Sequence, residues 1–130
     1  MKKIVCIVAC ALVFSCHAPD QAKDKNKVYL KPNQLTIAKR TDTLVISENT
    51  CKGCAYEYAT HFDVEDSLGM TKLDRIVTTD NDRSGTVNKD LFLVPVKTGR
   101  TSIKLYKYYH QKPTAEDSAQ GAVYSIEIKN

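Results

Sequence analysis

Two cysteines stand close together in the segment Cys51-Lys52-Gly53-Cys54, and thiols can carry redox, metal or cross-linking chemistry. A thioredoxin-like redox pair needs a helix after its first cysteine, and this stretch has no helical pattern. A haem attachment motif needs a histidine after the second cysteine, where Ala55 stands. A zinc site needs four ligands, and only His61 and some carboxylates could supplement the thiols. A disulfide that stiffens a loop is therefore favoured, with redox or metal chemistry as the alternatives.

The other residues that could do chemistry are scattered along the chain. None of the three histidines belongs to a motif that would pair it with a nucleophile as a base. Asp80, Asp82 and Asp90 do not have the spacing of an EF-hand calcium loop, so a solvated acidic loop is favoured, with weak calcium binding as the alternative. We therefore predict a protein that is not an enzyme and has no catalytic residue, cofactor or metal site.

Tyrosines and lysines alternate in one segment near the C-terminus. Tyr106, Tyr108 and Tyr109 are interleaved with Lys104 and Lys107. Tyrosine supplies a large contact area at a small cost in entropy, so this segment could be a binding surface. The alternative is an ordinary strand with one packed face and one solvated face.

The N-terminus has the pattern of a cleaved export signal. Lys2 and Lys3 precede eleven uncharged apolar residues, which are too few to span a bilayer as a helix. The run ends at Ser15-Cys16, which resembles the lipobox of bacterial lipoproteins. We expect residues 1–15 to be the signal peptide, Cys16 to be lipidated, and residues 16–27 to be a flexible tether. A plain secretory signal cut near Ala18 is the alternative.

The charge of the chain gives no reason to expect nucleic acid as a partner. The chain has 19 Lys and Arg against 15 Asp and Glu, and loss of Lys2 and Lys3 leaves 17 against 15, a net +2. The basic residues are dispersed and are not interleaved with a row of stacking aromatic residues. The partners that we expect are a protein and, through the lipid, a membrane.

Period-two alternation of apolar side chains dominates residues 28–130, and it is typical of strands. No window of eleven residues shows a helical stripe. The alternating segments are 27–31, 34–38, 42–47, 55–66, 72–79, 90–96, 100–109 and 122–130. Short strands separated by turn residues about every ten positions predict one all-β domain, an immunoglobulin-like antiparallel β-sandwich of seven to eight strands. Pro95 indicates an edge strand or a bulge, because proline cannot donate to a ladder.

Taken together, residues 43–129 resemble the chagasin family of immunoglobulin-like inhibitors of papain-like cysteine proteases. Asn49 and Gly53 match the asparagine and glycine of the first family loop, Asn-Pro-Thr-Thr-Gly-Tyr, and Tyr56 is an aromatic residue nearby. Ser84-Gly85 is similar to part of the Gly-rich second loop. The segment Tyr109-His110-Gln111-Lys112-Pro113 replaces the Arg-Pro-Trp of the third loop.

The resemblance implies a partner-binding edge made of three loops at one end of the sandwich. Its residues would be Asn49, Thr50, Cys51, Lys52, Gly53, Tyr56, Ser84, Gly85, Tyr109, His110, Gln111 and Pro113. The expected function is a lipid-anchored inhibitor or binding module for papain-like cysteine proteases, held at the outer membrane of a bacterial cell envelope. The alternatives are an envelope interaction or assembly lipoprotein and a thiol–disulfide protein.

Overall fold

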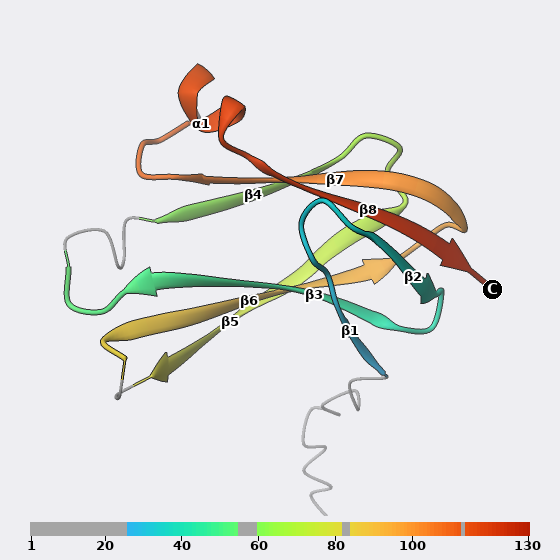
Figure 1. The fold of residues 1–130 in the computed structure, drawn as a ribbon, viewed down its shortest axis with the longest axis horizontal. Coiled ribbons are helices and arrows are strands. Elements are labelled where there is room, and N and C mark those ends of the chain that lie inside the picture. The colour runs from blue at the N-terminus through green and yellow to red at the C-terminus, as the bar shows by residue number, and fades with distance from the viewer. Residues whose placement is uncertain (1–25, 55–59, 82–83, 113) are drawn as a thin grey trace, which may run out of the picture.

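The computed structural model describes residues 26–54, 60–81, 84–112 and 114–130, which form two facing sheets and one short helix (Figure 1). Alternating apolar residues in short segments between turns produce these strands, because one face of each strand can be buried. The elements are β1 (Lys27–Tyr29), β2 (Leu35–Lys39), β3 (Thr43–Cys51), β4 (His61–Asp66), β5 (Thr71–Asn81), β6 (Thr86–Pro95), β7 (Gly99–Tyr108), α1 (Ala115–Ala119) and β8 (Ala122–Lys129). The predicted immunoglobulin-like β-sandwich is confirmed, with eight strands in the described residues.

Each sheet has four strands, and each has one parallel pair at its edge. The first sheet has the order β1-β3-β6-β5, and the second has the order β2-β8-β7-β4. β1 runs parallel to β3, and β2 runs parallel to β8, whereas the remaining pairs are antiparallel. Alternation predicts which residues form strands but not the direction of an edge strand, because both directions bury the same face.

The core lies between the sheets and is made by inward-facing residues of the central strands. The largest fully buried side chains of this core are Leu44, Ile46, Leu91, Leu93, Ile103, Ile126 and Ile128. Burial of one such side chain stabilises the fold by about 1.5–3 kcal/mol. Along β8 the burial follows the period-two pattern, with Tyr124, Ile126 and Ile128 inside.

Two details differ from the sequence-based expectations. Pro95 is neither on an edge strand nor in a bulge: it is the last residue of the central strand β6. At this place β6 ends, so the missing N–H interrupts no further pairing in the sheet. The sequence shows no helical stripe, yet the connection between β7 and β8 contains the one-turn helix α1.

The connections between the strands lie at two opposite ends of the sandwich. At one end, which we call the crossover end, segments 40–42, 67–70 and 96–98 each carry the chain from one sheet to the other. At the other end, which we call the loop end, β3, β5 and β7 end and β4, β6 and β8 begin, and the residues described in the three connecting segments are 52–54 and 60, 84–85, and 109–112 and 114–121. Figure 1 shows the loop end at the left.

The carboxylate of Asp66 joins the two sheets at the crossover end. One oxygen accepts the backbone N–H groups of Met70 (2.9 Å) and Thr71 (2.7 Å) and the Thr71 hydroxyl (2.8 Å). The other accepts the Leu68 N–H (3.0 Å) and the Thr101 hydroxyl. Thr71 opens β5 in one sheet and Thr101 lies on β7 in the other, so one side chain fixes the crossover.

The second crossover packs on the first. The carbonyl of Met70 accepts the N–H groups of Val96 (2.8 Å) and Lys97 (3.3 Å). A Cβ at Gly99 would lie 3.0 Å from the terminal carbon of Met70, and Gly99 has a φ of 129°. Glycine is therefore required at this turn for both its backbone conformation and the close contact.

Among the described residues, no helix has the length and apolar character that a membrane crossing requires.

We expect Asp66→Asn to lower the free energy of unfolding by about 1–2 kcal/mol near neutral pH, because an amide offers only one acceptor oxygen to these donors. Desolvation raises the pKa of Asp66, but the hydrogen bonds from Thr101, Thr71 and Leu68 outweigh it and hold the pKa below its usual value. The stabilisation is therefore complete above pH of about 4, and it is lost as the pH falls through the lower folded-state pKa. Urea denaturation across this range measures the effect.

The matched control is Asp74→Asn, which removes an exposed carboxylate on β5 that contacts Arg75. It should change the stability little at any pH. An equal decrease in the free energy of unfolding for both variants would show that the hydrogen bonds of Asp66 do not stabilise the crossover.

Candidate functional site

Three connecting segments leave the sandwich at the loop end. In the first sheet, Cys51 at the end of β3 and Asn81 at the end of β5 both pair with Thr86 at the start of β6. In the second sheet, His61 at the start of β4 pairs with Tyr108 at the end of β7. The register therefore brings the three segments of the expected binding edge to one end of the domain.

The first segment is closed by a disulfide between Cys51 and Cys54, whose Cα atoms lie 5.9 Å apart. Gly53 has a φ of 72°, a conformation that glycine adopts without strain. Thr50 is only 6% exposed, and its hydroxyl donates to the carbonyl of Val87 (3.4 Å). Thr50 therefore holds β3 against β6, whereas Asn49, Cys51, Lys52 and Gly53 are exposed.

The described surroundings of this disulfide contain neither a helix N-terminus nor a cluster of metal-ligating side chains. Cys51 is the last residue of a strand, so no helix N-terminus stabilises its thiolate as a thioredoxin-like pair requires. No group of three or more metal-ligating side chains that could hold an ion occurs among residues 26–54, 60–81, 84–112 and 114–130. The disulfide accordingly serves as a brace for the loop.

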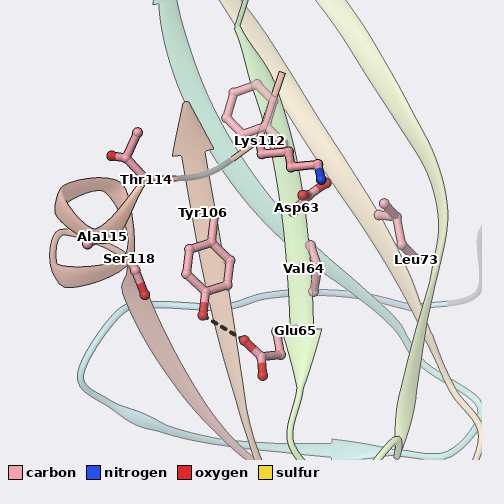
Figure 2. A pocket seen from close by; sticks show the side chains of 10 residues that line it. Asp63, Val64, Glu65, Leu73, Tyr106, Lys112, Thr114, Ala115 and Ser118 are labelled. Carbon is pink, nitrogen blue, oxygen red and sulfur yellow. Dashed lines mark hydrogen bonds between the residues drawn. The ribbon is translucent and has the colours of Figure 1, made fainter. Parts of the chain in front are cut away.

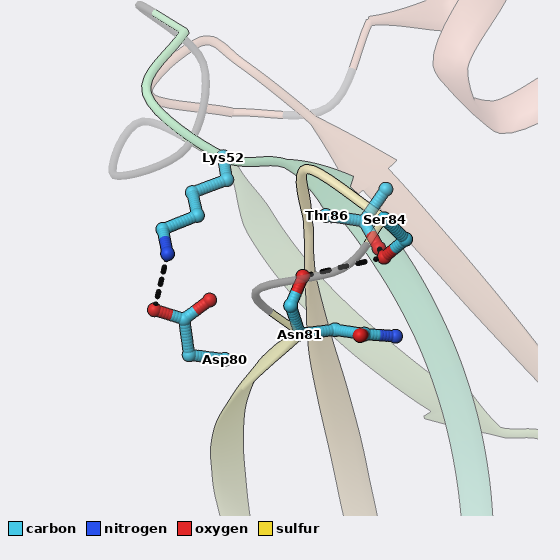
Figure 3. A network of polar contacts seen from close by, with 5 residues as sticks. All are labelled: Lys52, Asp80, Asn81, Ser84 and Thr86. Carbon is cyan, nitrogen blue, oxygen red and sulfur yellow. Dashed lines mark hydrogen bonds and ion pairs between the residues drawn. The ribbon is translucent and has the colours of Figure 1, made fainter.

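The second segment is the hairpin between β5 and β6, which contacts the first segment directly. The Lys52 N–H donates to the Gly85 carbonyl (2.9 Å), and Gly85 has a φ of 63°. The Lys52 ammonium pairs with Asp80 (2.7 Å) (Figure 3). Within the hairpin, the Ser84 hydroxyl bonds to both the Asn81 carbonyl (3.4 Å) and the Thr86 hydroxyl. These bonds hold Ser84 and Gly85 beside the disulfide loop.

The third segment begins where β7 ends. Tyr108 is buried, and its hydroxyl donates to Asp63 (2.8 Å), which raises the pKa of the phenol. The next three residues, Tyr109, His110 and Gln111, are exposed at the loop end. Of the tyrosines expected as a binding surface, Tyr108 therefore packs inside, and Tyr109 is 45% exposed.

A capping box closes the third segment at α1. The Thr114 hydroxyl accepts the Asp117 N–H (3.2 Å), and Asp117 accepts the Thr114 N–H (2.7 Å). The N–H and the hydroxyl of Thr114 both donate to the Asp117 carboxylate (2.7 Å each) and keep its pKa below the usual value, with a smaller contribution from His110. The pattern Thr-x-x-Asp before a helix is the sequence signal that could have predicted α1.

A lysine on β7 ties the second sheet to the first segment, which the sequence did not indicate. The Lys107 ammonium donates to the carbonyl of Asn49 (2.9 Å) and lies 3.8 Å from the carboxylate of Glu48. Lys107 and Asn49 are 58 positions apart, so only the folded sandwich brings them together. This contact ties the end of β3, which leads into the first segment, to β7, which leads into the third.

Beside the loop end, a cleft of about 850 Å³ opens between β4, the start of β5 and α1 (Figure 2). Phe62, Val64 and Leu73 form its apolar part, and Tyr106 and Ser118 lie on the side of β7 and α1. The Tyr106 hydroxyl donates to Glu65 (2.6 Å), which raises the pKa of the phenol. The third loop segment supplies one wall of the cleft through Lys112, Thr114, Ala115 and Ser118, and the residues described for the first two segments do not line it.

Three residues of the expected sites, Cys16, Tyr56 and Pro113, lie outside the described residues.

No protein-family model and no curated protein matches the chain. Among solved structures, the chain is similar to the cysteine protease inhibitor EhICP2 from Entamoeba histolytica, with a TM-score of 0.60 and 17% identity over 80% of this chain and 94% of that one. The solution structure of amebosin also matches, with a TM-score of 0.42 and 11% identity over 81% of this chain and 96% of that one. The likeness to EhICP2 establishes a shared fold, as the resemblance to the chagasin family implies.

We expect the free energy of unfolding of the double variant Cys51→Ser, Cys54→Ser to be about 2 kcal/mol lower than that of the oxidised protein, because a short cross-linked ring restricts the unfolded chain. Urea denaturation with and without reductant measures the loss. The parent protein in reductant should match the double variant, and the double variant should not respond to reductant. Rapid labelling of both cysteines by a thiol reagent in the untreated folded protein would contradict the cross-link.

Proposed function

We propose that the domain is an inhibitor or binding module for papain-like cysteine proteases, which it contacts through the three segments at the loop end. The observation that carries the proposal is that β3, β5 and β7 end at the same end of the domain, where Lys52 is bonded to Gly85 and Lys107 on β7 is bonded to Asn49 on β3. The shared fold with a cysteine protease inhibitor supports the choice of partner.

The loop end has the physical properties that insertion into a protease cleft requires. A loop that is already ordered loses less conformational entropy when it binds, so rigidity increases affinity. The disulfide and the bond to Gly85 supply this rigidity in the first segment. The charge of Lys52, which would be costly to bury alone, is balanced by Asp80 at 2.7 Å.

The second candidate is an envelope interaction or assembly lipoprotein that binds through a side of the sandwich. The cleft of about 850 Å³ beside β4 and α1 favours this candidate, because it combines apolar walls with Glu65, Tyr106 and Ser118. A thiol–disulfide activity has less support, because Cys51 ends a strand rather than beginning a helix.

In either case we propose that the chain is held at a bacterial outer membrane by lipid on Cys16. The support is the sequence of residues 1–16, with its two lysines, its apolar run and the cysteine that follows Ser15. Two or more acyl chains on one cysteine would make the attachment stable.

The proposal predicts that a soluble chain beginning at Ala18 inhibits papain in competition with substrate. Alanine at Lys52, Ser84 and His110, one residue in each segment, should together raise the inhibition constant on the order of 100-fold, because contacts from all three loops are lost. Steady-state inhibition assays measure the change, and circular dichroism checks the fold.

Lys97→Ala is the matched control, because Lys97 is exposed at the crossover end. It should leave inhibition unchanged. If papain and related proteases retain full activity at high concentrations of the folded domain, the inhibitor proposal is wrong. Variants in the cleft, such as Tyr106→Ala, would then be tested for loss of binding to envelope proteins.

A further inference from the structure

The crossover end carries a surface in which exposed apolar and basic side chains are mixed. We call it the basal surface and define it by Ile37, Lys39, Arg40, Leu68, Lys97 and Lys129. Lys39 pairs with Lys129 in register, and the Arg40 N–H donates to the Lys129 carbonyl (2.7 Å). Leu68 and Lys97 belong to the two crossovers that meet at Met70. Both groups of residues therefore lie at the crossover end of the sandwich.

The two apolar members are among the most exposed large side chains of the domain. Ile37 is 57% exposed and Leu68 is 56% exposed. Ile37 points outward because it alternates with the buried Ala38 on β2. Leu68 also borders a shallow groove that reaches Leu35, another exposed residue of β2. Nothing in the core requires apolar residues at these positions.

The basic members carry an excess of positive charge. Lys39, Arg40 and Lys97 are exposed, and their side chains form no ion pair within the described parts of the chain. The acidic residues at this end are occupied or shielded. Asp42 is buried and accepts the Lys39 N–H (2.7 Å), and Asp66 holds the crossover.

The remaining acidic group at this end is already balanced by two cations. Glu127 lies 3.0 Å from the guanidinium of Arg100 and 3.8 Å from the ammonium of Lys129. One carboxylate thus faces two basic side chains, and the positive excess of the basal surface remains.

The N-terminal segment joins the domain at this same end. The carbonyl of Asn26 accepts the N–H of Thr43, and Lys27 pairs with Thr43 at the start of β3. The ten chain steps from Cys16 to Asn26 can span at most about 36 Å. A lipid on Cys16 would therefore keep the basal surface within reach of the bilayer.

We propose that the basal surface docks on the headgroups of an anionic phospholipid bilayer. Lys and Arg side chains are attracted to anionic lipid phosphates, and exposed apolar residues among them can enter the interface. The loop end, at the opposite end of the sandwich, then points away from the membrane and stays accessible. This inference goes beyond the proposed function, because it holds whatever the loops bind.

The first test is vesicle sedimentation with a soluble chain from His17 to Asn130, which keeps every described element. It should bind phosphatidylcholine vesicles that contain phosphatidylglycerol and not pure phosphatidylcholine vesicles, and added salt should weaken binding. The variant Lys39→Ser, Lys97→Ser should bind the anionic vesicles on the order of 30-fold more weakly.

The charge-matched control is Lys31→Ser, Lys112→Ser, which removes two exposed lysines away from the basal surface. It should keep most of the binding. An equal loss in the two variants would show that binding follows net charge alone, and the docking surface would be rejected. Absence of binding to either kind of vesicle would also overturn the proposal, and papain inhibition in solution would be unaffected by that result.

The second test uses the absence of tryptophan from the chain to report orientation. The single fluorophore of Ile37→Trp should shift its emission to shorter wavelength on anionic vesicles and be quenched by brominated lipid. Tyr109→Trp, at the loop end, should show neither effect. The same response at both positions, or quenching only at the loop end, would contradict the proposed orientation.

Discussion

The fold depends on how the chain passes between its two sheets, and the carboxylate of Asp66 fixes that passage. A sandwich whose sheets exchange strands must bend the backbone sharply, and each bend leaves N–H groups without a partner in the sheet. Asp66 accepts three such N–H groups and two hydroxyls, from Leu68 to Thr101. Met70 then joins this crossover to the next through Val96 and Lys97. The relative position of the sheets is therefore set at the crossover end.

This arrangement leaves the opposite end available for irregular segments. Because the sheets are fixed elsewhere, the loop end needs only local bonds to hold its shape. The disulfide of Cys51 and Cys54, the hydrogen bond of Lys52 to Gly85, and the contact of Lys107 with Asn49 are all of this kind. Binding residues on ordered connections of a rigid scaffold can vary without loss of the fold. The shared fold with EhICP2 at only 17% identity is consistent with a constant scaffold that carries variable loops.

The sequence predicted the strands and most of the core because alternation is a local signal. Two pairs show this: Leu44 and Ile46, and Ile126 and Ile128, stand two positions apart in the sequence. All four side chains are fully buried. The parallel edge pairs and the place of Pro95 could not be predicted, since both depend on which strands become neighbours. Lys107 was assigned to a possible binding strand, yet it contacts Asn49, 58 positions away. The capping box of Thr114 and Asp117 is present in the sequence, but the helix that it begins has only five residues and so gives no helical stripe.

Exposed cations at the two ends of the sandwich differ in whether an acidic side chain pairs with them. At the loop end Lys52 is paired with Asp80, which lowers the cost of bringing that end against a protein surface from which water is excluded. At the crossover end Lys39, Arg40 and Lys97 have no such partner within the described residues, and their charge remains available to a polyanionic surface. A bilayer interface keeps headgroups and water around a cation, so unpaired lysines cost little there. The pairing of Lys52 with Asp80 thus suits the loop end to the proposed protein partner, and the cations without an ion pair in the described residues suit the crossover end to the proposed membrane contact.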